Sequence, residues 1–140
     1  MAEQGQPARV LVVAHRTAAT PKLIEEVRAR AVREPCVFTL LVPRPYWDPD
    51  TDEASATLEL AVPLLSEATG GQVEGRLGDA DPYVAVRDTL ASEHFDEVII
   101  STLPARVSQW LKRDLPHRVE QLGYSVTVVR ATQASHPTSG

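Results

Sequence analysis

The chain has 140 residues, close to the usual size of one folded domain, so a single hydrophobic core is expected. Hydrophobic residues make up 43% of the sequence and charged residues 24%, a composition that excludes an intrinsically disordered chain. The net charge of −5 at pH 7 gives no general attraction to nucleic acid or to anionic lipid. Any phosphate-binding site must therefore be local, and neither nucleic acid nor a membrane is an expected partner.

The single cysteine, Cys36, excludes an intrachain disulfide and a zinc site made of cysteines. It begins an apolar run, and we interpret it as a buried small hydrophobic residue rather than a reactive thiol. Residues 1–7 lack the apolar stretch of a signal peptide, and no apolar run approaches the ~20 residues needed to cross a bilayer. These features predict a cytoplasmic protein.

Apolar runs rich in β-branched residues predict the strands of one sheet. Continuous runs, unlike alternating patterns, are typical of parallel strands that helices cover on both faces. Four runs are clear and one, just before position 78, is weaker. They occupy Val10 to Ala14, Cys36 to Val42, Gln72 to Leu77, Val98 to Ile100 and Val126 to Val129.

Helical patterns fill the intervals between these runs. Thr20 and Asp81 each precede a proline, an arrangement that suits a helix N-cap followed by the first helical position. A capping box that starts at Asp50 begins the second predicted helix, and Pro63 within that helix predicts a kink or a break. The last predicted helix starts at Asp114, whose side chain is expected to cap it. Glycine follows the second and the last of these helices and is expected to end them.

The elements alternate as β-α-β-α-β-α-β-α-β. This order predicts an α/β fold with a five-stranded parallel sheet, right-handed crossovers and helices on both faces, a Rossmann-like three-layer sandwich. Residues 1–133 are expected to form one domain. Residues 134–140, rich in Ser, Thr and Pro, are expected to form a flexible C-terminal tail.

Over residues 9–129 the sequence resembles the universal stress protein family. The resemblance rests on a first strand, a Gly-Asp-Pro-like turn before a helix, an Asp-led aliphatic strand, and a last strand after a helix that ends near Arg-Val. In this chain these segments are Arg9 to Val13, Gly78 to Pro82, Phe95 to Ser101, His117 to Val119 and Tyr124 to Val129. The resemblance implies the strand order 3-2-1-4-5, a cytoplasmic stress-response role, and a homodimer formed through the last strand. The apolar edge of that strand, Tyr124 to Val129, also favours pairing with a second copy.

Nucleotide-binding members of that family carry Gly-x-x-Gly after the fourth strand, and Gly-Ser or Gly-Thr about nine residues later. Glycines there let backbone N–H groups approach the phosphates of ATP. In this chain Ser101 and Pro104 stand at the first two glycine positions, and Arg113 and Asp114 at the last pair. Proline has no N–H to donate, and an aspartate at a helix start repels phosphate. We interpret the chain as a degenerate member that lacks the glycine-rich ATP-binding loop. We therefore expect it to bind no cofactor, or to bind ATP only if side chains replace the loop.

Basic and hydroxyl side chains near two strand ends are candidates to replace that loop. In an open α/β sheet, ligands bind beyond the carboxyl ends of the strands where the strand order reverses, here between the first and fourth strands. One interpretation is an anion site for a nucleotide or phosphometabolite, with Arg16 and Arg106 as phosphate partners. The other, which we favour, is a solvated basic face paired with nearby carboxylates. The candidate residues are His15, Arg16, Thr17, Ser101, Thr102, Arg106 and Arg113.

Trp110 lies among basic residues and is open to two interpretations. It is either a base-stacking platform, as in nucleic-acid-binding proteins, or a residue buried against the sheet or a partner subunit. We expect burial, because the chain as a whole is acidic.

Motifs of enzymatic sites are absent from the sequence, which contains no nucleophile elbow, no His-Glu-x-x-His and no Walker motif. His15 acting as a base for Ser101 lacks an identifiable third group to orient it. We therefore expect a non-enzymatic protein that binds a small anionic ligand weakly or not at all. The alternative is an ATP- or nucleotide-binding regulatory module with an arginine-based phosphate site, and a small hydrolase or transferase is less favoured.

Overall fold

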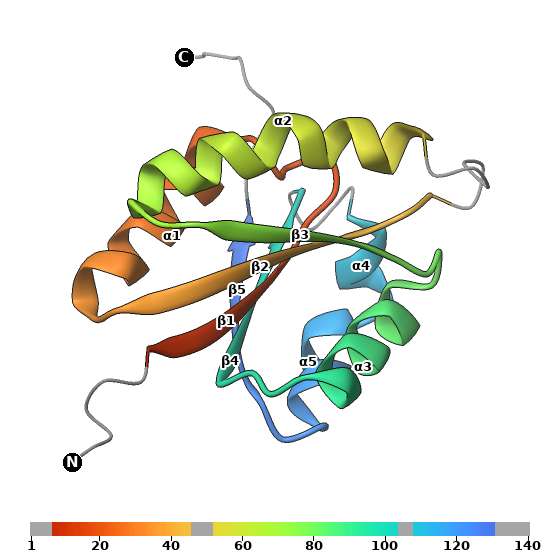
Figure 1. Ribbon diagram of the computed structural model, residues 1–140. Helices are drawn as coiled ribbons and strands as arrows, with labels where there is room; N and C mark the ends of the chain where they lie inside the picture. The colour runs from red at the N-terminus through yellow and green to blue at the C-terminus, as the bar shows by residue number, and fades with distance from the viewer. Residues whose placement is uncertain (1–6, 46–51, 104–107, 131–140) are drawn as a thin grey trace, which may run out of the picture.

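A five-stranded, fully parallel sheet organises the chain, with the strands in the order β3-β2-β1-β4-β5 (Figure 1). It is seen in a computed structural model, which describes residues 7–45, 52–103 and 108–130. The α/β class and the 3-2-1-4-5 order predicted from the sequence are both confirmed. The strands are β1 (Ala8–Val13), β2 (Cys36–Pro43), β3 (Val73–Gly78), β4 (Glu97–Thr102) and β5 (Ser125–Arg130).

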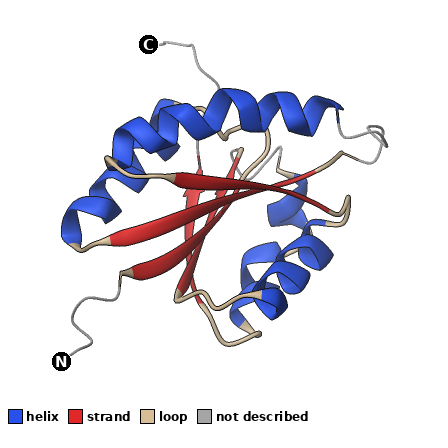
Figure 2. Cartoon of the chain, viewed as in Figure 1, coloured by secondary structure: helices blue, strands red, loops and turns tan. Residues whose placement is uncertain are grey.

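Helices cover both faces of this sheet (Figure 2). Two long helices pack together on one face, and three shorter ones lie on the other. None of the helices in the described ranges is long and apolar enough to cross a membrane. They are α1 (Pro21–Arg33), α2 (Asp52–Thr69), α3 (Pro82–Ser92), α4 (Gln109–Lys112) and α5 (Leu115–Glu120).

The central strand β1 shows why residues 10–13 form a continuous apolar run. Val10 and Val12 point into a core shared with α1 and α2, whereas Leu11 and Val13 point into a second core shared with α3 and α5. All four side chains are at most 1% exposed. Because successive residues of a strand face opposite sides, a strand covered on both faces needs an apolar residue at every position.

Helix α2 runs through Pro63 without interruption. Of the two predicted outcomes at this residue, a break does not occur, and a kink stays a prediction. The flanking residues Ala61 and Leu65 are buried in the core and fix the helix on both sides of the proline, while Pro63 itself is exposed. The carbonyl that loses its hydrogen bond to proline can therefore be solvated by water. Asp50, the expected start of the capping box, lies outside the described residues.

The start of α5 also differs from the prediction. Asp114 occupies the N-cap position with φ 60° and ψ 37°, in the left-handed region, and its side chain makes no capping hydrogen bond. A capping side chain reaches the first N–H groups from an extended backbone, so the expected aspartate cap is wrong. The sequence analysis also missed α4, a four-residue helix that begins after Ser108, whose Oγ accepts a hydrogen bond from the Leu111 N–H at 3.1 Å.

The other predicted helix ends agree better with the structure. The Asp81 carboxylate caps α3 by accepting hydrogen bonds from the N–H groups of Tyr83 and Val84 at 3.0 and 3.4 Å. Thr20 stands at the N-cap position of α1, but its hydroxyl donates to the Thr17 carbonyl instead of capping the helix. The glycines after α2 and α5 have φ of 73° and 100°, which is the reason glycine ends these helices. The predicted tail, residues 134–140, lies outside the described residues.

A partly buried ion pair joins helix α1 to the amino end of β4. The Arg30 guanidinium donates two hydrogen bonds, each 2.8 Å long, to the two carboxylate oxygens of Glu97. These bonds hold the pKa of Glu97 below its usual range, more strongly than burial raises it. Arg30 is only 7% exposed, so this two-pronged contact supplies the polar partner that a buried guanidinium needs.

Candidate functional site

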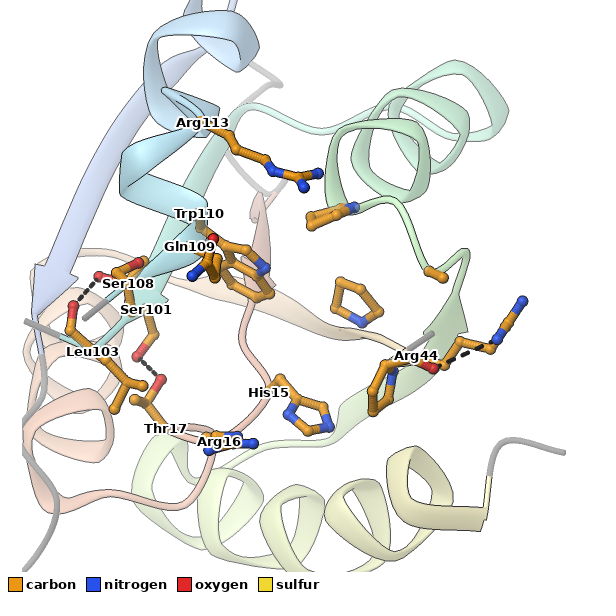
Figure 3. A pocket seen from close by; sticks show the side chains of 15 residues that line it. His15, Arg16, Thr17, Arg44, Ser101, Leu103, Ser108, Gln109, Trp110 and Arg113 are labelled. Atoms are coloured by element: carbon orange, nitrogen blue, oxygen red, sulfur yellow. Dashed lines mark hydrogen bonds between the residues drawn. The ribbon is translucent and has the colours of Figure 1, made fainter. Parts of the chain in front are cut away.

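A cavity of about 550 Å³ lies beyond the carboxyl ends of β1, β2 and β4 (Figure 3). Its wall comes from five short segments: residues 15–17 after β1, 43–45 at the end of β2, 80 and 82 before and at the start of α3, 101–103 at the end of β4, and 108–110 with 113 around α4. The position agrees with the general rule for open parallel sheets, in which the strand order reverses between the two central strands. Here those strands are β1 and β4.

The structure brings together all but one of the candidate residues named from the sequence. The cavity wall includes His15, Arg16, Thr17, Ser101, Thr102 and Arg113. The remaining candidate, Arg106, lies outside the described residues. Residues that are 84 or more positions apart in the chain thus meet at one place, because parallel strands present their carboxyl ends at the same edge of the sheet.

Two hydroxyl groups form the polar floor of this cavity. The Oγ1 of Thr17 and the Oγ of Ser101 are 2.5 Å apart, and both residues are buried. Thr102 donates from its Oγ1 to the carbonyl of Leu103 at 2.8 Å. The hydroxyls at the end of β4 are therefore engaged by Thr17 and by backbone, an arrangement that stabilises the wall and does not activate a nucleophile.

Positive charge gathers around the mouth of the cavity. Arg16 and Arg113 are exposed there, Arg44 is half-buried, and the described lining residues include no aspartate or glutamate. His15 is also half-buried, with its Nε2 3.6 Å from the Glu53 carboxylate on α2. In a chain with a net charge of −5, this wall is a local region suited to an anion.

Among the lining residues that were not sequence-based candidates, Arg44 adds a charge and Trp110 an aromatic ring. Arg44 follows β2, and its backbone N–H donates to the Gly78 carbonyl at 3.2 Å. The candidate residues came from the segments after the first and fourth strands, although the end of the adjacent second strand reaches the same edge. Trp110 belongs to α4, which is too short to show a helical period.

Trp110 has two roles in the structure. It packs against the core formed by β1, β4, α3 and α5, and it also lines the cavity, so that the side chain is half-buried. The expected burial is thus met only in part, because the indole packs against the core on one side and lines the cavity on another.

The turn between β3 and α3 brings another part of the wall into place. A Cβ atom added to Gly78 would lie 2.7 Å from the Cβ of Ala85 and 3.0 Å from a methyl group of Leu41. Glycine therefore permits the end of β3 to approach α3 closely. The following Asp79 carboxylate accepts a hydrogen bond from the Asp81 N–H at 2.9 Å, and this turn sets residues 80 and 82 against the cavity.

A metal centre has no support in the described part of the chain. No group of three His, Cys, Asp or Glu residues among residues 7–45, 52–103 and 108–130 is placed to hold an ion. The chemistry that the wall offers is that of cations, hydroxyls and one indole.

Solved structures of universal stress proteins are similar to this chain over most of its length. A universal stress protein from Archaeoglobus fulgidus superposes with a TM-score of 0.65 at 17% sequence identity, covering 91% of this chain and 98% of that one. One from the same organism in complex with dAMP gives 0.64 at 17% identity, over 89% and 98% of the two chains. A universal stress protein in complex with cAMP gives 0.66 at 13% identity, over 89% and 98%.

No protein-family model and no curated protein sequence matches the chain. The structural likeness nevertheless extends over the whole sheet and its helices, and it agrees with the strand order described above. The chain has the fold of the universal stress proteins.

Proposed function

We propose that this chain is a universal-stress-like binding protein of the cytoplasm that holds a small anionic ligand weakly in the cavity and performs no chemistry on it. One observation carries the proposal: three arginines line the cavity, and none of its described lining residues is an aspartate or a glutamate. The resemblance to universal stress proteins supports the cytoplasmic and stress-response parts of the proposal.

The dimensions and the cations of the cavity favour a nucleotide or a phosphometabolite. A volume of about 550 Å³ lies in the range of small-molecule sites. Arginine side chains bind phosphate with two parallel hydrogen bonds, which gives orientation as well as charge. Two structures with the same fold hold the nucleotides dAMP and cAMP, and this supports a ligand of that size here.

We expect a low affinity because the sequence lacks the glycines that bring backbone N–H groups close to a phosphate. Residues 101–122 contain no glycine, whereas the resemblance to nucleotide-binding universal stress proteins implies several in this segment. Each charge-assisted hydrogen bond lost in this way costs about 1.5–3 kcal/mol. Arg16 and Arg113, which would take over this role, are exposed to solvent, so salt screens their attraction for an anion.

Binding without catalysis is supported by the partners of the hydroxyl groups. Within the part of the chain that the structure describes, Ser101 at the end of β4 is hydrogen-bonded to Thr17 and not to a histidine or a carboxylate. A hydrolase would need a base within hydrogen-bonding distance of its nucleophile. An ATP-binding regulatory module is the alternative, and it would show itself by binding ATP more tightly than AMP.

Calorimetric titration of the purified chain with AMP, with ATP and with ribose 5-phosphate tests the proposal. We expect dissociation constants in the high-micromolar to millimolar range, and we expect added salt to weaken the binding. Arg113→Ala and Arg16→Ala should each lower the affinity about tenfold. Arg28→Ala, which removes an exposed arginine on α1 outside the cavity, is the matched control and should have no effect.

Two results would contradict the proposal. The first is that none of these compounds binds at millimolar concentration. The second is equal affinity in the Arg113→Ala, Arg16→Ala and Arg28→Ala variants, which would place the anion elsewhere. Turnover of AMP, ATP or ribose 5-phosphate by the wild-type chain would contradict the non-enzymatic part alone.

The proposal also includes a homodimer formed through the last strand, residues 124–129. Strand β5 lies at one edge of the sheet. Strand β4 pairs with one side of β5, and no other described strand pairs with its second side. Ser125 and Thr127 are exposed on this strand, and Val126 and Val128 are half-buried. A free strand edge with few charges favours pairing with the same edge of a second copy.

A further inference from the structure

The Trp110 indole is the only Phe, Tyr or Trp side chain among the described residues of the cavity wall. Ser108 caps the short helix that carries it, and the indole also packs against the second core. The side chain is therefore fixed in position while part of its surface faces the cavity. A large aromatic surface kept open in a pocket is typical of a ligand contact.

Other apolar residues accompany the indole in the wall. Three prolines, at positions 43, 45 and 82, and Leu103 line the same cavity as the arginines. A ligand that is only a phosphate, or a sugar phosphate, would satisfy the cations and leave these apolar surfaces in contact with water. A ligand that uses the whole cavity needs a flat apolar part as well as an anionic part.

The cationic and aromatic parts of the wall come from one segment. Trp110 and Arg113 are three residues apart around α4, a spacing that places side chains on the same side of a helix. Figure 3 shows both side chains extending from this segment into the cavity, with His15 on the opposite side. An aromatic ring against Trp110 and an anionic group against Arg113 can therefore belong to one small molecule.

We infer that Trp110 is a specificity-determining residue, a stacking wall that makes the cavity select an aromatic anion over an aliphatic one. The inference rests on the proposed function and adds to it a ligand class, a nucleotide rather than a sugar phosphate. Base–aromatic stacking contributes to affinity without reading the identity of the base, so the selection is for a ring and not for adenine in particular.

Tryptophan fluorescence tests this inference directly, because the chain contains only two tryptophans, Trp47 and Trp110. The variant Trp47→Phe leaves Trp110 as the only tryptophan, so the tryptophan emission reports on this residue alone. Titration of this variant with AMP should quench the emission in a saturable manner, with the affinity measured by calorimetry. Ribose 5-phosphate, which is AMP without its base, should bind about tenfold more weakly and leave the emission unchanged.

Substitutions of Trp110 separate stacking from packing. Trp110→Leu should weaken AMP binding about tenfold and change ribose 5-phosphate binding less than twofold, while Trp110→Phe should retain most of the AMP affinity. Circular dichroism and thermal unfolding establish that each variant is folded. Equal losses for both ligands in Trp110→Leu, or no loss for AMP, would overturn the inference.

The test distinguishes this inference from the proposed function on which it rests. If the wild-type chain binds ribose 5-phosphate as tightly as AMP, with no quenching by either, the stacking role is wrong and the anion site stands. If it binds neither compound at millimolar concentration, both are wrong.

Discussion

The hydroxyl groups of Thr17 and Ser101 are 2.5 Å apart and join the loop after β1 to the end of β4, directly beneath the cavity. Both residues are at most 2% exposed, so water has little access to either hydroxyl. The pair fixes the relative position of the two strand ends at which the sheet order reverses. It also leaves each hydroxyl dependent on the other, and this dependence can be measured.

Removing one hydroxyl of this pair should lower the free energy of unfolding by more than half of the loss that follows from removing both. Ser101→Ala leaves the Thr17 hydroxyl buried with one partner fewer, a loss of about 1–3 kcal/mol in the free energy of unfolding. Thr17→Val should cause a similar loss, and the double variant should lose less than the sum of the two. Urea denaturation of the four proteins gives the coupling energy. Strict additivity would show that the contact does not contribute to stability.

The turn at Gly78 gives a second prediction about the wall. Gly78→Ala would place a Cβ 2.7 Å from the Ala85 Cβ, so α3 must shift, at a cost of about 1–3 kcal/mol. Gly71→Ala is the matched control, because nothing lies within 4 Å of its added Cβ, and its stability should change by less than about 0.5 kcal/mol. Thermal unfolding of both variants measures the difference. Equal stability of the two would mean that β3 does not need glycine at its end.

The fold was predictable because most of its elements carry their own local signal. The continuous apolar run of β1 indicates a strand covered on both faces, and the Asp81 cap with its following proline marks the start of α3. The site was predictable to the extent that it follows from topology, since the ends of parallel strands meet at one edge.

The parts that could not be predicted depend on tertiary structure. Helix α4 has four residues, too few to show a hydrophobic period. The basic neighbours of Trp110 suggested a stacking role, but nothing in the sequence placed the indole at this edge of the sheet. Aspartate tolerates both extended and left-handed backbone, and its identity alone did not settle the conformation of Asp114. The contribution of Arg44 depends on the parallel pairing of β2 with its neighbours, a relationship between strands and not within one.

The proposed homodimer predicts a charge effect at the edge of β5. Thr127 is exposed on this strand, and a lysine there would add a positive charge to each side of a symmetric pairing of two β5 edges. Thr127→Lys should therefore weaken the dimer about tenfold or more, as measured by sedimentation velocity at micromolar concentration. Glu74→Lys, on the opposite edge strand β3, is the control and should leave the association unchanged. A wild-type chain that sediments only as a monomer would contradict the dimer itself.

The ion pair of Arg30 and Glu97 predicts how stability depends on pH. The hydrogen bonds from Arg30 lower the pKa of Glu97 in the folded chain, so the folded state favours the ionised carboxylate. Its contribution is fully present above the ordinary glutamate value of about 4.3 and is lost as the pH falls through the lower folded value. The wild-type chain should therefore lose stability between about pH 5 and pH 3.

The variant Glu97→Gln isolates this contribution. It should be less stable than wild type at pH 7 by about 1–3 kcal/mol, because a neutral amide replaces one charge of a largely buried pair. Its stability should fall less steeply between pH 5 and pH 3, although Asp96, whose pKa is lowered chiefly by a hydrogen bond from the Arg9 backbone N–H, still titrates in the same direction. Urea denaturation at a series of pH values measures both effects, with Glu74→Gln as an exposed control. If Glu97→Gln kept the pH slope of the wild type, the pair would not be the source of the acid sensitivity, and other carboxylates would have to supply it.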